Sequence, residues 1–432
     1  MKSIWADSVD KITFPPLPQD TSTDVLIVGG GIAGILTAYY LKQEGIDVML
    51  AESNEILQGI TQDTTAKITV THGLIYDKLI NRFGLNKAQL YLKAQTLALH
   101  QYSKLCQTIN CDFEPCDSYV YSLSDEIAIR KEIEAYHRLG GNAEFSLAKE
   151  LPFQVAGAVR VTEQAHFHPL KFLYAIANKL PIYERTKVLE ITPDKAITNH
   201  GTIRYKKLII ATHFPILNKH GSYFLKLYQH RSYVIALKNA PILNGMYVDE
   251  SKKGLSFRRH KDLLLLGGGG HRTGKKGGCW QELEDFAKTY YPKAEITARW
   301  ATQDCMTLDG IPYIGQYAKS TPNVYVMTGF NKWGMTNAMA GAHILCDLVR
   351  GKNNPYADVF SPSRSILHPQ LAVNAFESTI GLLTPTTPRC PHLGCALKYN
   401  KAEHSWDCPC HGSRFREDGE LINNPATDDK RM

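Results

Sequence analysis

The chain has 432 residues, of which 44% are hydrophobic and 21% charged, and its formal net charge is +7 at pH 7. This length predicts two or three domains with a core large enough to need no disulfide bonds. The composition excludes a disordered chain, and without a long basic block nucleic acid is not an expected partner. Four of the ten cysteines fall within 21 residues near the C-terminus: Cys390, Cys395, Cys408 and Cys410.

The N-terminal part of the sequence carries no targeting or membrane-spanning pattern. Residues 1–20 are polar and have no apolar h-region, so a signal peptide is not expected. The most apolar early stretch, 25–41, is interrupted by four glycines, so no membrane span is expected there. We therefore predict a cytoplasmic protein whose scattered cysteines are reduced packing residues.

A glycine-rich turn between two short apolar segments is the first motif. Residues 24–28 are typical of a buried parallel strand, 35–45 of a helix and 47–51 of a second strand. Three glycines with the G-x-G-x-x-G spacing follow the first strand: Gly29, Gly31 and Gly34. This spacing allows a tight turn, the approach of backbone to a pyrophosphate and close packing of helix on strand. The segment predicts dinucleotide binding.

An acidic residue and a second turn narrow the choice of nucleotide. Glu52 ends the second strand, 23 residues after Gly29, where a carboxylate accepts from a ribose hydroxyl; this favours FAD or NAD over NADP. Much later, a predicted strand at 324–327 and a predicted helix at 335–350 flank a turn that contains Gly329 and Gly334. A second helix N-terminus of this kind suits the electron-rich edge of a flavin ring.

At these residues the chain resembles the D-amino-acid-oxidase-like flavoproteins, in particular the glycine/D-amino-acid dehydrogenase group. The matching residues are Gly29, Gly31, Gly34, Glu52, Asp309, Pro312, Gly315, Gly329, Phe330, Gly334 and Met335. The resemblance covers about residues 22–365 and implies FAD. It also implies an α/β fold in which a Rossmann-like FAD domain of the glutathione-reductase type carries an inserted antiparallel-sheet substrate domain.

The same resemblance implies further contacts to FAD. Val188 stands where relatives give a backbone contact to adenine, and the segment 59–67 stands where relatives wrap the flavin. The expected FAD-binding residues are Gly29, Gly31, Gly34, Glu52, Thr61, Thr65, Val188, Gly329, Gly334 and Met335. The glycine run 267–270 is expected to form a turn and not a second fingerprint, because no suitable helix follows it.

Two cysteine–histidine pairs near the C-terminus form the second motif. Cys390 and His392 have the spacing C-x-H, and after fifteen residues Cys408 and His411 have the spacing C-x-x-H. A Rieske [2Fe–2S] centre needs two thiolates on one iron and two imidazoles on the other. These four residues are therefore the predicted iron ligands. A structural zinc site in the same residues is the alternative.

The tail resembles Rieske proteins, and the whole chain resembles a bacterial family of D-amino-acid-oxidase-like flavoproteins with a C-terminal Rieske domain. In respiratory Rieske proteins, residues at the places of Cys395 and Cys410 form a disulfide between the two cluster loops; two reduced thiols are the alternative. The domain is abridged, because few residues separate it from the flavin domain and 369–383 are expected to form a helix and not strands. We predict that it still holds a cluster.

The expected domain boundaries follow from both resemblances. An FAD-dependent oxidoreductase domain is expected at 1–365, a linker at 366–388 and the abridged β-rich Rieske [2Fe–2S] domain at 389–432. Within the first domain, FAD-binding parts are expected at about 22–75, 160–215 and 300–365. Substrate-domain parts are expected at about 76–159 and 216–299.

The leading hypothesis is an FAD-dependent oxidoreductase that oxidises a small substrate and passes electrons through the Rieske cluster to an external protein or quinone. The resemblance suggests an amine or an amino acid. Two alternatives stay open: an electron-transfer or redox-sensing protein without a small substrate, and a flavoprotein with a zinc-binding tail. A Rieske oxygenase is not expected, since no helix carries the two histidines and one carboxylate of a mononuclear iron site.

The sequence assigns no residue to catalysis. Lys67 and His72 lie at or just after the end of the flavin-wrapping segment, and Trp333 lies in the second glycine turn, so these three are candidates, with packing as the alternative role. Three arginines are candidates for binding a substrate carboxylate, with ordinary packing or surface roles as the alternative: Arg231, Arg258 and Arg272.

Overall fold

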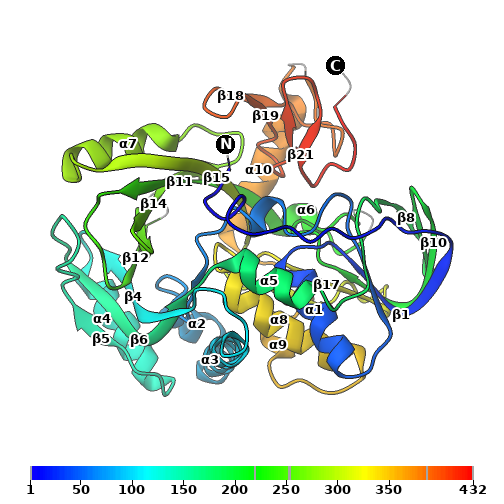
Figure 1. Cartoon of the computed structure of the whole chain (residues 1–432), viewed down its shortest axis with the longest axis horizontal. Coiled ribbons are helices and arrows are strands. Elements are labelled where there is room, and N and C mark those ends of the chain that lie inside the picture. Colours follow the sequence, from blue (N-terminus) through cyan, green and yellow to red (C-terminus); the bar gives the residue numbers. More distant parts are fainter. Residues whose placement is uncertain (1, 218–219, 252–253, 386–387, 431–432) are drawn as a thin grey trace.

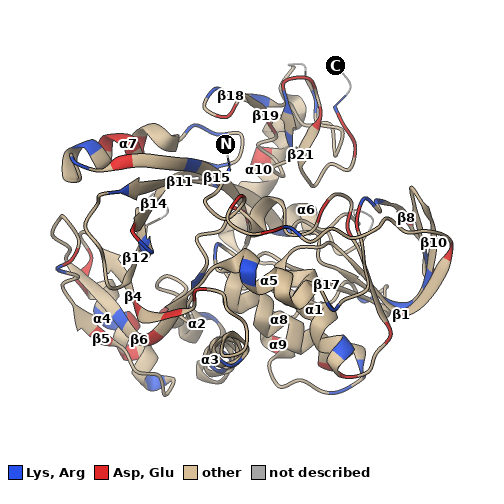
Figure 2. Ribbon diagram, viewed as in Figure 1, with Lys and Arg blue, Asp and Glu red and all other residues tan. Residues whose placement is uncertain are grey.

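The structure, a computed structural model, describes residues 2–217, 220–251, 254–385 and 388–430. Within these ranges three β-sheets, each with its own helices, occupy three regions of the molecule (Figure 1). Positive and negative side chains are interspersed over all three regions (Figure 2). No helix in the described part of the chain is long and apolar enough to cross a membrane.

The first sheet has eight strands among the described residues, in the order β16-β17-β10-β1-β2-β7, with the β8–β9 hairpin beside β10. Strands β17, β10, β1, β2 and β7 are parallel, and β16 is antiparallel to β17. Its strands are β1 (Thr21–Val28), β2 (Val48–Ala51), β7 (Ile182–Tyr183), β8 (Val188–Ile191), β9 (Lys195–Thr198), β10 (Gly201–Ile210), β16 (Tyr313–Gln316) and β17 (Val324–Thr328). This Rossmann-like sheet confirms the predicted FAD-domain architecture.

Helices cover this sheet because their apolar side chains complete its core. The largest buried cluster joins β1 to residues of α1 (Ile32–Gln43), α3 (Leu85–Cys106), α5 (Pro169–Ala177) and α8 (Gly334–Val349). The helix after the first turn begins at Ile32, three residues before the predicted start, because Gly31 itself occupies the N-cap position with extended backbone. The turn therefore leads directly into the helix N-terminus.

The second sheet has nine strands in the described ranges, in the order β15-β11-β14-β13-β12-β4-β6-β3, with β5 paired to β6. It is antiparallel except where β12 runs parallel to β4. Its strands are β3 (Lys67–Ile68), β4 (Glu114–Ser122), β5 (Glu144–Ser146), β6 (Gly157–His166), β11 (Leu227–Lys238), β12 (Met246–Asp249), β13 (Ser256–His260), β14 (Leu263–Arg272) and β15 (Glu295–Thr307). Helices α2 (Tyr76–Phe83), α4 (Glu126–Arg138) and α7 (Cys279–Tyr290) accompany it.

One sequence prediction was wrong in this sheet. The glycine run 267–270 is not a turn but continues β14 to Arg272. Its backbone pairs with β11 on one side, and the ladder with β13 extends to Gly267 on the other. Gly267 and Gly268 pair with β11, and Gly267 also pairs with β13, whereas Gly269 has a left-handed backbone (φ 59°) within the strand. Pairing thus overrides the local preference of this run for a turn.

The third sheet is a small antiparallel sheet near the C-terminus, in the order β18-β19-β20-β21. Its strands are β18 (Lys398–Asn400), β19 (Ser405–Asp407), β20 (Arg414–Arg416) and β21 (Leu421–Asn423). The predicted helix at 369–383 is confirmed as α10 (Pro369–Leu383), which lies beside this sheet (Figure 1). The remaining described helices are α6 (Tyr223–Lys226), α9 (Ala357–Phe360) and the 3-10 turn Gly59–Thr61.

Candidate functional site

A cavity of about 910 Å³ lies where the three regions meet. The glycine turn after β1 lines one end, strands β11 and β15 of the second sheet line a wall, and residues 421–424 and 426–427 of the small C-terminal region contribute to another. Nine of the ten predicted FAD-binding residues line this cavity; the exception, Gly34, lies behind the turn. Whether each contacts FAD stays a prediction.

The glycine turn is shaped by close packing. A side chain on Gly34 would place its Cβ 1.9 Å from the Gly29 carbonyl oxygen, so α1 can approach β1 this closely only with glycine here. The backbone N–H of Gly30 donates to Glu52 Oε2 over 2.7 Å, which fixes the Glu52 carboxylate at the cavity edge. The N-terminus of α1 lies at the cavity, where the helix dipole and N–H groups without an intrahelical partner suit a pyrophosphate.

The flavin-wrapping segment is tied to that helix and to the second sheet. Thr61 Oγ1 accepts from the backbone N–H of Ile32 over 3.1 Å, at the first turn of α1. The Thr65 hydroxyl accepts from Lys67 Nζ over 3.1 Å, and its carbonyl accepts from Arg258. Arg258 is fully buried, and it also donates to the Ala66 carbonyl over 3.3 Å. Arg258 is thus a support for this segment.

Lys67 is a half-buried lysine at the cavity wall. Burial and, to a smaller extent, the neighbouring Arg258 charge lower the pKa of Lys67 to about 7. The lysine lines the cavity from β3, and its hydrogen bond to Thr65 fixes the amino group. A lysine with a pKa near neutrality can exist as the free amine and accept a proton.

His72 and Trp333 come together on another part of the wall. Their rings stack with centroids 5.2 Å apart at 18°. His72 Nδ1 meets the Tyr91 hydroxyl at 2.7 Å, and Nε2 meets Thr336 Oγ1 at 3.0 Å. Burial lowers the pKa of His72 to about 3, so the ring is neutral at physiological pH. Both candidates line the cavity, and the neutral His72 holds the Trp333 ring in place.

Sequence reasoning missed an acid–base pair on the same cavity. Asp304 of β15 and Lys332 of the second glycine turn both line it, and each shifts the pKa of the other. Burial raises the pKa of Asp304 and lowers that of Lys332, while their mutual attraction opposes both changes. Lys332 has a left-handed backbone (φ 74°), and Asn331 beside it bonds the Thr307 N–H over 2.8 Å. The sequence signal that could have found Lys332 is a charged residue inside a glycine turn.

The three candidate arginines have other partners. Arg231 pairs with Glu403 of the C-terminal region, and Arg272 donates to the carbonyls of Pro409 and Cys410, both over 3.2 Å. Arg258 supports the flavin-wrapping segment. Among the described residues that line the cavity there is no arginine. These contacts favour the packing alternative for the three arginines.

The four predicted iron ligands lie on two short loops, two ligands on each, and the loops face each other. Cys390, Cys408 and His411 are at most 2% exposed, and the rings of His392 and His411 have centroids 4.9 Å apart. The Gly394 N–H donates to the Cys390 carbonyl, and the Gly412 N–H donates to the Cys408 carbonyl, both over 2.9 Å. These bonds close the two loops.

The donor set fits a [2Fe–2S] cluster of the Rieske type. The buried ring nitrogens of His411 find no nitrogen or oxygen partner among the described residues, which leaves them available to a metal. The Cys390 thiol hydrogen-bonds Cys408; this contact lowers the pKa of Cys408 and raises that of Cys390, so Cys408 ionises the more readily of the two predicted thiolate ligands. The ligand assignment stays a prediction.

Cys395 and Cys410 lie beside the ligand loops as free thiols. The sulfurs of Cys395, Cys408 and Cys410 lie within 4.8 Å of one another. A Cβ at Gly381 of α10 would lie 2.4 Å from Cys410 Sγ, so the helix packs directly on this group. The structure does not contain the predicted disulfide, which stays a prediction. Helix α10, the helix predicted for 369–383, thus packs against the cluster loops.

Comparison with known proteins agrees with both halves of the molecule. Residues 24–348 match the family model of FAD dependent oxidoreductases, and residues 369–431 match that of the Rieske [2Fe-2S] domain. The second match includes α10, which lies in the segment expected as a linker. The fold and the two sites define a flavin- and iron–sulfur-containing oxidoreductase. The chain belongs to the FAD dependent oxidoreductase family, with a C-terminal Rieske domain.

Individual relatives share this organisation in whole or in part. The Rieske 2Fe-2S iron-sulfur protein YhfW of Bacillus subtilis is 35% identical, with 98% of this chain and 96% of that protein covered. The 491 aligned positions exceed the 432 residues here, so that relative has segments this chain lacks. Gamma-glutamylputrescine oxidoreductase of Escherichia coli is 24% identical over 81% of this chain and 89% of its own length. Glycine oxidase from Geobacillus kaustophilus has the same fold, with TM-score 0.67, 19% identity and coverage of 80% and 99%.

The chain is therefore an FAD-dependent oxidoreductase that uses FAD and a Rieske [2Fe–2S] cluster. When bound, FAD accepts a hydride and releases single electrons, and the cluster carries one electron at a time.

Proposed function

We propose that the chain oxidises a small amine or amino acid at FAD and passes the electrons through its Rieske cluster to an external protein or quinone. The observation that carries this proposal is the common cavity: the nucleotide-binding turn, the second sheet and the Rieske domain all line it. A substrate bound there would contact FAD on one side, and the Rieske domain that receives the electrons from FAD would lie next to the same cavity.

Lys67 is the proposed proton acceptor for the substrate amine. Its amino group lines the cavity, and its pKa of about 7 leaves much of it neutral at physiological pH. Asp304 and Lys332 offer a carboxyl and an amino group to a polar substrate. His72 and Trp333 form a rigid stacked wall that orients the substrate and excludes water.

The test is anaerobic reduction of the holoprotein by a panel of amines, amino acids, NADH and NADPH, followed by visible absorption. We expect an amine or amino acid to bleach the flavin bands and then the longer-wavelength absorption of the cluster. Reduction by NADH, NADPH or a protein donor alone would overturn the proposal in favour of an electron-transfer or redox-sensing protein.

A further inference from the structure

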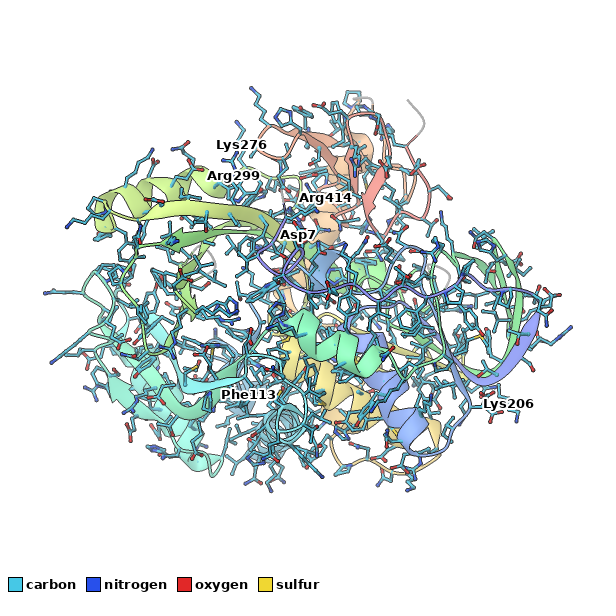
Figure 3. The ribbon with its side chains drawn as sticks, in the orientation of Figure 1. Asp7, Phe113, Lys206, Lys276, Arg299 and Arg414 are labelled. Atoms are coloured by element: carbon cyan, nitrogen blue, oxygen red, sulfur yellow. The ribbon has the colours of Figure 1, made fainter. Side chains whose placement is uncertain are left out.

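Buried charges hold the Rieske domain against the second sheet. Glu403, in the turn between β18 and β19, pairs with Arg231 of β11 and, over 2.8 Å, with Arg414 of β20. The side chains of Arg231, Glu403 and Arg414 are 3%, 9% and 5% exposed. Separating these three side chains would leave buried charges without partners, so the group favours one fixed position of the Rieske domain. Figure 3 labels Arg414 at this junction.

Two buried glutamines connect the cavity to the second cluster loop. His213 lines the cavity, and its Nε2 meets Gln229 Oε1 at 3.2 Å. Gln303 Nε2 donates to Gln229 Oε1 over 2.6 Å and to the carbonyl of Gly412 over 2.9 Å. Gly412 directly follows the predicted iron ligand His411. Gln229 and Gln303 are 1% and 0% exposed, so solvent does not interrupt this chain of contacts.

The cluster loops pack tightly on this wall. A Cβ at Gly412 would lie 2.5 Å from Gln229 Cβ, so the loop backbone touches the glutamine. Gln229 Nε2 also donates to the carbonyl of Asn424, another residue of the cavity wall, over 2.8 Å. On the other side, the ring of Phe214 lies with its centroid 6.3 Å from that of His392. Both predicted imidazole ligands therefore lie next to elements of the flavin domain or second sheet.

We propose that Gln229 and Gln303 are positioning residues that fix the electron path between the FAD cavity and the cluster, so that electrons cross within one chain and without movement of the Rieske domain. This inference rests on the proposed function only for the source of the electrons. An amine that becomes an imine loses two electrons and two protons. The electrons cross singly, the protons leave to solvent, and the external acceptor reoxidises the cluster after each crossing.

The experiment uses the full-length holoprotein without oxygen and reduces its flavin by a light flash with EDTA as the electron donor. Cluster reduction is then followed by absorption and by electron paramagnetic resonance of frozen samples. In Gln303→Met and in Gln229→Met we expect cluster reduction to slow by about tenfold, because the cluster loop is no longer held against the wall; this fold-change corresponds to about 1.4 kcal/mol of activation free energy. Because light replaces the substrate, the result does not depend on whether any amine reduces the flavin.

The matched control is Gln164→Met, a buried glutamine of β6 whose Oε1 accepts from the Val70 N–H and which has no bond to the Rieske domain among the described contacts. It is expected to keep the wild-type transfer rate. Iron content and the resonance spectrum show that each variant retains its cluster. For the wild type, we expect a rate that changes neither with protein concentration nor with added viscosity. Wild-type rates in both interface variants, or a rate that depends on concentration or viscosity, would overturn the inference.

Discussion

The two cofactor motifs and the surfaces between them are built in different ways. The dinucleotide turn and the cluster loops each occupy one short run of sequence, 24–52 and 390–411, and backbone geometry shapes both. The cavity wall and the domain junction instead bring together side chains from distant strands; Arg231 and Glu403, for instance, are 172 positions apart. Local motifs thus identify the cofactors, whereas we expect the surfaces assembled from distant strands to determine which substrate binds and how the Rieske domain docks.

The largest effect is expected at a local motif. Cys390→Ser removes one predicted thiolate ligand, so the variant loses its cluster while it retains FAD, whose turn lies in another sheet. Iron and acid-labile sulfide analysis, together with the flavin spectrum, measures both. Cys116→Ser, a cysteine of β4 far from the cluster loops in sequence, is the control. A full cluster in Cys390→Ser would contradict the ligand assignment.

The next effect is expected on the assembled wall, at Lys67. Lys67→Met removes the proposed proton acceptor, and flavin reduction by the substrate should slow by about 10²–10⁴-fold. Because burial lowers the pKa of Lys67 to about 7, the wild-type rate should rise as pH increases through 7 and then level, and the variant should lose this inflection. Stopped-flow flavin reduction, at pH values from about 5.5 to about 9 on both sides of that pKa, measures this pH dependence.

Stability separates a functional Lys67 from a structural one. Between the lowered pKa of about 7 and its ordinary value, the unfolded chain holds a proton on Lys67 that the folded chain lacks. Wild-type stability therefore rises with pH across this window, and Lys67→Met should be more stable than the wild type at neutral pH, by a margin that shrinks as pH rises. Lys78→Met, another lysine of the cavity lining, is the control. A joint loss of stability and activity would assign Lys67 to packing.

The domain junction should be the next most sensitive place. Glu403→Leu leaves Arg231 and Arg414 buried without their shared carboxylate, which should cost about 3–5 kcal/mol in urea unfolding. Burial raises the pKa of Glu403, but the two guanidinium groups outweigh it and hold the pKa at about 2. The contribution is therefore present above the ordinary range of a glutamate and is lost as pH falls toward 2. In the control Glu417→Leu, an exposed glutamate is replaced, and the free energy of unfolding should fall by about 1 kcal/mol or less. An equal loss of unfolding free energy in the two variants would contradict the role of Glu403 at the junction.

The smallest of these effects is expected in the dinucleotide turn. Gly34→Val forces α1 away from the Gly29 carbonyl, and overpacking of this kind costs about 1–3 kcal/mol. Because the displaced turn is the predicted pyrophosphate site, FAD should also dissociate more readily during gel filtration. Gly351→Val, where a Cβ meets open space but the left-handed backbone (φ 73°) strains the side chain, is the control for lost stability alone and should retain FAD. Equal FAD retention in the two variants would show that the turn tolerates displacement.

The sequence predicted what is encoded locally. The strand–turn–helix units and the C-terminal helix were found because their signals lie within one segment, although α1 begins three residues early because Gly31 is its N-cap. The strand at 267–270 was missed because pairing with β11 overrides the turn preference of glycine. Asp304 and Lys332 were missed because their juxtaposition depends on how β15 lies against the second glycine turn, which no local pattern records.

The most direct test of the account counts electrons. In an anaerobic reductive titration of the purified chain, FAD takes two electrons and a Rieske cluster takes one, so the account predicts about three electrons per chain. The flavin bands and the longer-wavelength cluster absorption should both be lost, with a resonance signal from the reduced cluster. Uptake of about two electrons, with bleaching of the flavin alone and no cluster signal, would contradict it.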